Sequence, residues 1–288
     1  MMDMSIEIIA FKLLNIYKSK KIFDFSAEPL FGDASGRQYF RIVFGKESAV
    51  LMKVADIKPG EFGRGDSFND FIAIKNLFDM SGIKVPKIYA SIPEQKALLL
   101  EDLGDTTLFK LIQSEKKNRL KHVRSAVDLL VKTQHHLYNR TFFDSPADKR
   151  TFDVKLFMDE FYHFYEYMIA KRVYDKPFNG VWPKLEKKFK QISHDLSTQP
   201  YLLSHRDFQS KNIMVKNGVS YLIDFQDALM APAVYDLVSL LRDSYVVLSD
   251  SEVEMMLKYY WKTSSTANEI FSCYEDLEKA FYLQTVQR

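Results

Sequence analysis

The segment His-Arg-Asp-Phe-Gln-Ser-Lys-Asn, at 205–212, carries the side chains best suited to chemistry. Within it Asp207 precedes Asn212, and Asp224 follows in a second stretch, Ile-Asp-Phe-Gln-Asp. A carboxylate such as Asp207 can accept a proton from a hydroxyl group, while the oxygens of Asn212 and Asp224 are hard ligands suited to Mg²⁺. Metal-assisted phosphoryl transfer requires this combination, so the spacing predicts a catalytic base at Asp207 and metal ligands at Asn212 and Asp224.

The same positions also have structural explanations. His205, Asp207 and Asn212 could satisfy backbone groups of a loop, and Asp224 could begin a turn after a strand. The complete set favours catalysis, because a hairpin separates the loop from Asp224 and a strand-rich part precedes both. We predict that His205 packs near Phe225 and braces the loop, and that Asp207 is the base.

The elements that must position these residues begin with a strand-rich part over residues 28–101. Its β-branched and aromatic runs, separated by Gly, Pro and polar residues, predict short antiparallel strands. One helix is expected between them, because apolar residues recur at helical spacing from Phe68 to Phe78 and Gly82 can end it. The expected strands cover 38–44, 49–55, 87–91 and 97–101.

After residue 101 the pattern becomes mainly helical. Asn217-Gly218 is the strongest hairpin signal in the chain and interrupts the helices. We expect residues 1–101 to form an N-terminal nucleotide-binding lobe and residues 102–288 a C-terminal catalytic and acceptor-binding lobe, with a cleft between them. The expected helices cover 119–138, 153–170, 183–197, 234–248, 252–262 and a last one from 267.

Composition excludes several classes of protein. The 288 residues include 40 Lys and Arg against 38 Asp and Glu, a net charge of +2 that argues against a nucleic-acid partner. The single cysteine, Cys273, cannot form an internal disulfide, so a cytoplasmic location is expected. The first residues predict an amphipathic helix rather than a signal peptide, and no apolar run is long enough to span a membrane.

Two omissions narrow the predicted chemistry. Only ALMAPAVY separates Asp227 from Asp236, which leaves no room for the long activation segment of a protein kinase, so the acceptor is expected to be a small molecule. Position 209 is Gln, where protein kinases usually have Lys. The pattern instead resembles the aminoglycoside phosphotransferase and choline kinase superfamily. That resemblance implies an α+β, two-lobed protein-kinase-like fold, with a small antiparallel β lobe containing one helix and a larger, mainly helical lobe.

Further segments fit one branch of this superfamily: GDASGRQYFRI, VPKIYA, LLLEDLGD, HRDFQSKNIM and LIDFQDA followed by APAVYDLVSLLRDSY. On these segments the chain most resembles the bacterial N-acetylmuramate/N-acetylglucosamine 1-kinases of cell-wall recycling. The resemblance implies that ATP and Mg²⁺ are used to phosphorylate the anomeric hydroxyl of an amino sugar. It carries over Asp207 as base and Asn212 and Asp224 as metal ligands. Gln226 and Asp227 are candidates for contact either with these residues or with the substrate.

The nucleotide-binding residues are expected in the first lobe. The turn over the phosphates is predicted at 33–37, where Gly36 lets backbone N–H groups approach and Ser35 or Arg37 adds contacts. Lys53 occupies the place of the phosphate-binding lysine of kinases, although an ordinary strand lysine is the alternative. The usual helix glutamate that would pair with this lysine is not evident, since Asp70 is the only acid well inside the start of the next helix.

Glu101 and Leu103 are expected to follow the last strand as the interlobe hinge. Their backbone groups would meet adenine, and Glu101 is named for its position rather than for its side chain. Asp236 is predicted to be a buried acid that binds the catalytic loop, with Arg242 nearby.

Alternatives to an amino-sugar acceptor remain open. An aminoglycoside, a choline-like amino-alcohol or a homoserine-like compound would fit the same superfamily. A non-catalytic nucleotide-binding protein would fit the same fold, although the base and both metal ligands are present. The last residues are still helical at Arg288 and the resembled kinases continue further, so a C-terminal piece is expected to be missing.

Overall fold

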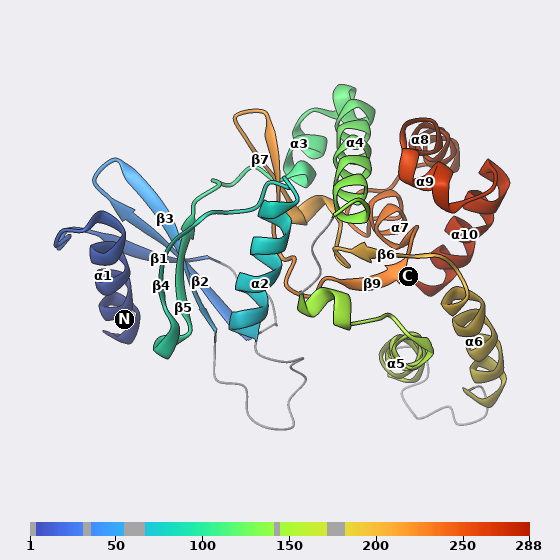
Figure 1. Cartoon of the computed structure of the whole chain (residues 1–288), viewed down its shortest axis with the longest axis horizontal. Coiled ribbons are helices and arrows are strands. Elements are labelled where there is room, and N and C mark those ends of the chain that lie inside the picture. The colour runs from blue at the N-terminus through green and yellow to red at the C-terminus, as the bar shows by residue number, and fades with distance from the viewer. Residues whose placement is uncertain (1–3, 31–35, 55–66, 141–144, 172–181) are drawn as a thin grey trace. The chain divides into compact units, whose positions relative to one another are not determined.

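The computed structural model describes residues 4–30, 36–54, 67–140, 145–171 and 182–288 (Figure 1). The chain folds into two compact units that interleave in sequence. The strand unit comprises Met1–Asp79, Lys84–Thr106 and Met214–Gln226. The helical unit comprises Met80–Ile83, Thr107–Ile213 and Asp227–Arg288.

The strand unit contains one antiparallel sheet with the order β1-β2-β3-β5-β4. Strands β2 and β3 form a hairpin whose tight turn uses Gly45 at a φ of 61°, a conformation that favours glycine. The strands are β1 (Ser26–Leu30), β2 (Arg37–Phe44), β3 (Glu47–Val54), β4 (Ile88–Ile92) and β5 (Ala97–Glu101).

Two helices complete the strand unit. Helix α1 (Met4–Lys18) places Leu13 and its apolar neighbours in one buried cluster with Ile42 and Leu99 of the sheet. Helix α2 (Ser67–Met80) buries Phe71 and other apolar residues. Every strand and helix expected in this part of the chain is therefore present.

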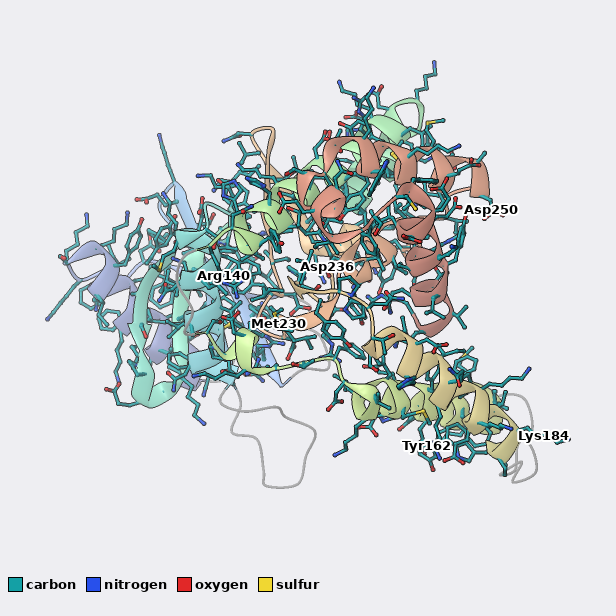
Figure 2. The ribbon with its side chains drawn as sticks, turned by 45° about the vertical axis from the view of Figure 1, so that its right-hand side comes forward. Arg140, Tyr162, Lys184, Met230, Asp236 and Asp250 are labelled. Carbon is teal, nitrogen blue, oxygen red and sulfur yellow. The ribbon has the colours of Figure 1, made fainter. Side chains whose placement is uncertain are left out.

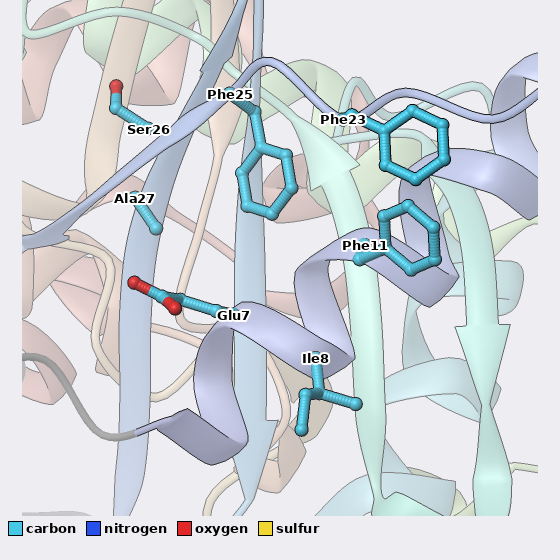
Figure 3. A pocket seen from close by; sticks show the side chains of 7 residues that line it. All are labelled: Glu7, Ile8, Phe11, Phe23, Phe25, Ser26 and Ala27. Atoms are coloured by element: carbon cyan, nitrogen blue, oxygen red, sulfur yellow. The ribbon is translucent and has the colours of Figure 1, made fainter.

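A surface pocket of about 620 Å³ lies between α1 and the segment that leads into β1 (Figure 3). Phe11 of the helix and Phe23 of the segment face one another across 5.3 Å between ring centroids. The pocket contains none of the residues predicted to bind nucleotide or to act in catalysis.

A second hairpin, formed by β7 (Ile213–Lys216) and β8 (Val219–Leu222), follows the predicted catalytic loop. Its turn uses Asn217 and Gly218, both with positive φ, as a two-residue hairpin turn requires. The Leu222 N–H donates to the Lys84 carbonyl over 2.9 Å, which ties the hairpin to the strand unit. The chain thus returns to the strand unit after residue 213, although the functional division at residue 101 stays a prediction.

The helical unit is built around α4, whose buried stripe includes Val127 and Leu130. Its helices are α3 (Leu108–Ser114), α4 (Arg119–Tyr138), α5 (Val154–Phe164), α6 (Trp182–Ser197), α7 (Tyr235–Leu241), α8 (Asp250–Thr263), α9 (Ser265–Ile270) and α10 (Tyr274–Gln287). Strands β6 (Tyr201–Ser204) and β9 (Leu229–Pro232) pair antiparallel within it. Figure 2 shows Asp236 in the interior of this unit and Asp250 at its periphery.

The structure differs from the expected helices at four places. The last helix, expected from 267, divides into α9, which ends at Ile270, and α10, which begins at Tyr274. The helix expected over 153–170 divides into α5 and a π-helical segment, Tyr165–Ala170. Helix α7 ends at Leu241 rather than at 248, because the Asp243 carboxylate accepts the Tyr245 N–H over 2.8 Å and turns the chain. Helix α3 was not expected; it begins where the Thr107 side chain accepts the Lys110 N–H.

No helix within the described ranges is both long and apolar enough to cross a membrane.

Candidate active site

The predicted catalytic loop connects β6 to the short helix Ser210–Asn212 and then to β7. Strand β6 is fixed by pairing with β9, and Phe208 in the loop is fully buried. His205 is also buried and packs edge-on against Phe208, with 5.9 Å between ring centroids. Its contacts are those of a residue that braces the loop, as the sequence indicated.

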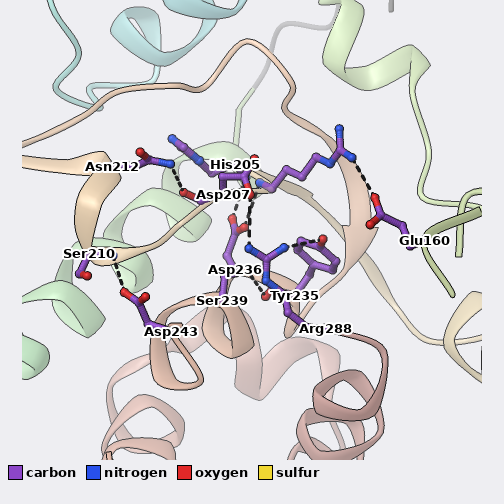
Figure 4. Close-up of polar contacts among 11 residues, drawn as sticks. Glu160, His205, Asp207, Ser210, Asn212, Tyr235, Asp236, Ser239, Asp243 and Arg288 are labelled. Carbon is purple, nitrogen blue, oxygen red and sulfur yellow. Dashed lines mark hydrogen bonds and ion pairs between the residues drawn. The ribbon is translucent and has the colours of Figure 1, made fainter. Parts of the chain in front are cut away.

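Asp236 holds the start of the loop from below (Figure 4). Its oxygens accept the His205 N–H over 2.7 Å and the Arg206 N–H over 3.1 Å, and the residue is only 1% exposed. Arg206 has a φ of 78°, a conformation that costs a non-glycine residue free energy and persists only with support of this kind. Burial raises the pKa of Asp236 to about 7, although both backbone bonds oppose that shift.

Asp243 holds the other end of the loop. Its Oδ2 accepts the Ser210 N–H over 2.7 Å, while its Oδ1 accepts the Tyr245 N–H. The sequence analysis did not single out Asp243, although it follows Asp236 at helical spacing in YDLVSLLRD. Arg242 does not take part in this support, because it pairs with the exposed Asp250.

Asp207 and Asn212 lie on the loop that these two acids support. The Asn212 Nδ2 donates to the Asp207 carbonyl over 3.0 Å, so the amide nitrogen is engaged and Oδ1 is the atom suited to a cation. The Asp207 side chain is 36% exposed, and its Oδ1 lies 3.3 Å from Arg288 Nη2. The loop therefore presents an accessible carboxylate beside a fixed amide oxygen.

Arg288 is a residue that the sequence analysis missed. Its Nη1 donates to the Tyr235 hydroxyl over 2.8 Å, and its guanidinium lies 5.2 Å from the centre of that ring. Arg288 and Asp207 are far apart in sequence, and only the packing of α10 against α6, α7 and α8 brings them together.

Asp224 belongs to the strand unit and has a φ of 63°. Its Oδ1 accepts Gln226 Nε2 over 2.8 Å and lies 3.6 Å from Arg37 Nη2. Phe225 anchors this turn by packing against Phe71, with ring centroids 4.9 Å apart. Gln226 is buried and donates to Asp224, so the contact that the structure gives it is with a predicted metal ligand, Asp224.

Arg37, predicted to contact phosphate, is buried with its guanidinium next to Asp224. Gly36 has a φ of 71°, and a Cβ added there would meet no other atom of the described residues within 4 Å, which suits a close backbone approach to a ligand. Ser35 lies outside the described residues. Lys53 is half-buried on β3, opposite Gln38 of β2 and Ala97 of β5.

Lys216 contacts the predicted hinge through one ion pair and one hydrogen bond. Glu101 Oε1 accepts Lys216 Nζ over 3.0 Å, which is consistent with a role for the Glu101 backbone rather than its side chain. Lys216 also donates to the Asp102 carbonyl over 2.8 Å. Leu103 is buried.

Arg41 braces the same segment, and the sequence analysis did not identify it. Its guanidinium binds Asp102 through Nε over 2.8 Å and Asp105 through Nη2 over 2.9 Å. Burial alone would raise the pKa of Asp102, but hydrogen bonds from Arg41 and the Gly104 N–H lower it. A charged Asp102 therefore fixes the chain that follows β5.

The predicted metal ligands have the chemistry that Mg²⁺ prefers. Asn212 donates through Nδ2 to the backbone, so its Oδ1 is the atom suited to a cation, and Asp224 accepts one hydrogen bond from Gln226 and forms an ion pair with Arg37. Within the described part of the chain, no group of at least three His, Cys, Asp or Glu side chains could hold a metal ion. Asn212 belongs to the helical unit and Asp224 to the strand unit, and each has an oxygen of the kind that Mg²⁺ prefers.

Asp227, a candidate substrate contact, belongs to the helical unit. It acts electrostatically on Arg206, whose guanidinium pairs with Glu160 over 3.1 Å. Desolvation would lower the pKa of Arg206, but Tyr235 and the neighbouring carboxylates keep it raised. Charged groups therefore surround Asp207 on the helical unit.

The sequence is similar to known kinases over most of its length. An N-acetylmuramate/N-acetylglucosamine kinase of Pseudomonas putida is 30% identical over 258 residues, which cover 89% of this chain and 71% of that protein. A kinase of the same name from Pseudomonas aeruginosa is 27% identical over 261 residues, with 90% and 72% covered.

Solved structures share the fold at low sequence identity. A choline kinase from Cryptosporidium parvum superposes with a TM-score of 0.68 at 16% identity, covering 99% of this chain and 87% of that one. An aminoglycoside-3′-phosphotransferase of type VIII gives a TM-score of 0.56 at 15% identity, covering 91% and 93%. The expected α+β, protein-kinase-like fold is confirmed.

The model of the phosphotransferase enzyme family (APH) matches residues 26–267, which include both stretches that carry the candidate base and metal ligands. A match over this much of the chain, together with the similar kinases, confirms the prediction of an enzyme that phosphorylates small molecules. The chain belongs to the phosphotransferase enzyme family and is an ATP-dependent small-molecule kinase.

Proposed function

We propose that the protein transfers the γ-phosphoryl group of ATP to the anomeric hydroxyl of N-acetylmuramate or N-acetylglucosamine. The observation that carries this proposal is the loop in which Asp207 is accessible while Asn212 is bonded to its carbonyl. The choice of acceptor is supported by the names of the similar kinases from two Pseudomonas species.

Asp207 is the base in this proposal. Its carboxylate orients the anomeric hydroxyl and takes its proton as the oxygen attacks the γ-phosphorus. A new oxygen–phosphorus bond forms, the bond to the β–γ bridging oxygen breaks, and ADP leaves. Asp236 and Asp243 hold the loop at both ends, so Asp207 is already in position when the acceptor binds. Orienting the base therefore adds less to the activation free energy.

Asn212 and Asp224 would hold Mg²⁺, which when bound neutralises charge on the phosphate oxygens. Gln226 and Arg37 fix the Asp224 carboxylate, so its orientation is set by the strand unit. In this arrangement Gln226 supports a metal ligand, and Asp227 remains a candidate for contact with the acceptor.

Nucleotide binding is assigned to residues 1–101 and catalysis and acceptor binding to residues 102–288. The backbone around Gly36, with Ser35 and Arg37, would meet the phosphates, and Lys53 would add a positive charge. The backbone of Glu101 and Leu103 would meet adenine, in the segment that Arg41 braces. A cytoplasmic location fits this proposal, because the reaction uses ATP and because Cys273 is the single cysteine of the chain, so no internal disulfide can form.

An acceptor panel with an ADP-release assay tests the proposal. Purified protein with Mg-ATP is given N-acetylmuramate, N-acetylglucosamine, choline, homoserine and an aminoglycoside. We expect turnover with the amino sugars, and loss of at least a hundredfold in Asp207→Asn with nucleotide binding retained. The matched control is Asp195→Asn, the same change on α6 at an acid that contacts Gln191.

Turnover of a cationic alcohol alone would replace the proposed acceptor. Full activity of Asp207→Asn would remove Asp207 as the base. Stabilisation by Mg-ATP without ADP release from any acceptor would favour a binding protein of this fold.

A further inference from the structure

The guanidinium of Arg288 lies beside the carboxylate that serves as base in the proposed reaction (Figure 4). Its Nη2 contacts Asp207 Oδ1 over 3.3 Å, a long contact for a charge-assisted hydrogen bond. The Arg288 side chain is 23% exposed and the Asp207 side chain 36%, so both can be reached by a small molecule. A positive charge thus stands where the acceptor must bind.

Tyr235, rather than Asp207, holds Arg288 in place. The buried Tyr235 hydroxyl accepts Nη1 over 2.8 Å, and the ring lies against the guanidinium. Tyr235 packs on Phe152, with 5.1 Å between centroids, and so cannot move without disturbing the core. The guanidinium therefore keeps its position when Asp207 turns to a hydroxyl.

Among the residues that the structure describes, a second arginine near Asp207 already has a carboxylate partner of its own. Arg206 forms an ion pair with Glu160 over 3.1 Å and also interacts electrostatically with Asp227. Arg288 has Asp207 as its carboxylate partner, and that partner is the one the acceptor hydroxyl would engage. Of these two arginines, Arg288 is the one whose charge becomes available on acceptor binding.

We propose that Arg288 binds a carboxylate on the acceptor and thereby sets the specificity of the enzyme for anionic acceptors. This inference rests on the proposed function and names the acceptor class as a hydroxy compound with a carboxylate. A guanidinium has five N–H donors, so two bonds to Tyr235 and Asp207 leave others for a carboxylate. N-acetylmuramate carries such a group, N-acetylglucosamine lacks it, and choline and aminoglycosides bring a positive charge that Arg288 repels.

The test compares kcat/KM for N-acetylmuramate with kcat/KM for its neutral methyl ester and for N-acetylglucosamine. We expect the wild type to prefer the acid, and Arg288→Met to lower that preference roughly ten- to hundredfold. Arg288→Lys keeps the charge and should retain part of the preference. Tyr235→Phe removes the hydroxyl that orients Arg288 and should lower it by a smaller factor.

A purely structural role for Arg288 gives a different result. If Arg288 only braces Asp207, Arg288→Met lowers kcat/KM for all three acceptors equally, the preference is unchanged, and the inference is overturned. Arg242→Met is the control, because it removes an arginine that pairs with the exposed Asp250 and should leave the preference unchanged. Thermal unfolding of each variant shows whether it is folded.

Binding separates this inference from the proposed reaction. Calorimetry with Mg²⁺ and a non-hydrolysable ATP analogue measures the affinity of the wild type for N-acetylmuramate and for its methyl ester without turnover. Tighter binding of the acid that is lost in Arg288→Met supports the inference even if neither sugar is phosphorylated, which would defeat the proposed function alone. Equal binding of acid and ester by the wild type overturns the inference.

Discussion

Replacing Asp236 by Asn should damage both stability and catalysis, because one buried carboxylate supports the loop that bears Asp207. An asparagine keeps a single acceptor oxygen and presents an NH₂ group to the second backbone N–H. The His205 and Arg206 N–H groups therefore cannot both stay bonded. The loop loses support at the residue that carries the positive φ.

The magnitude follows from these two bonds. Leaving one buried N–H without a partner costs about 1–3 kcal/mol, and the remaining bond to a neutral amide is weaker by about 1 kcal/mol. Removing a buried charge offsets part of this cost, so we expect a net loss of about 2 kcal/mol at pH 8. For a unit of this size that corresponds to a decrease in Tm of roughly 4–8 °C.

Calorimetric unfolding and ADP release measure the two effects. We expect kcat to fall about a hundredfold, since a displacement of about 1 Å at a reacting group has this effect. Asp250→Asn is the matched control: Asp250 lies on the same unit but its side chain is 92% exposed. An Asp236→Asn protein that unfolds and turns over as Asp250→Asn does would refute the role assigned to Asp236.

Three further predictions concern Arg41, Asp224 and the pH dependence of Asp236. Arg41→Met leaves Asp102 buried without its guanidinium, and should lower stability by about 2 kcal/mol in thermal unfolding and raise the KM for ATP. Asp224→Asn should raise the Mg²⁺ concentration needed for half-maximal rate at least tenfold, which a magnesium titration would measure, while chelation of the metal should stop turnover of the wild type. The folded pKa of Asp236 is raised from 3.8 to about 7, so the part of its contribution to stability that depends on protonation is full below about pH 4 and is lost as pH rises through about 7, which leaves the loss of about 2 kcal/mol expected at pH 8. Urea unfolding should accordingly show the stability difference between wild type and Asp236→Asn falling across that range.

Much of the fold could be predicted because its signals are local. The spacing of Val127 and Leu130 sets the buried face of α4, and Asn217-Gly218 sets a tight turn between β7 and β8. Such patterns depend on residues a few positions apart, so they can be interpreted without knowing how the rest of the chain folds. The end of α7 was predicted too late, because Asp243 turns the chain there while also binding Ser210, a residue distant in sequence.

The sequence by itself determined the chemistry that this protein can offer: Asp207, Asn212 and Asp224 at a spacing that predicts phosphoryl transfer, within a chain that the family match confirms as a small-molecule kinase. Only the tertiary structure decided which side chains support and surround them. Arg37 lies beside Asp224, Asp243 holds Ser210, and Arg288 stands beside Asp207. These contacts join residues far apart in the chain, and a long-range pair is set by how whole elements pack rather than by any local pattern.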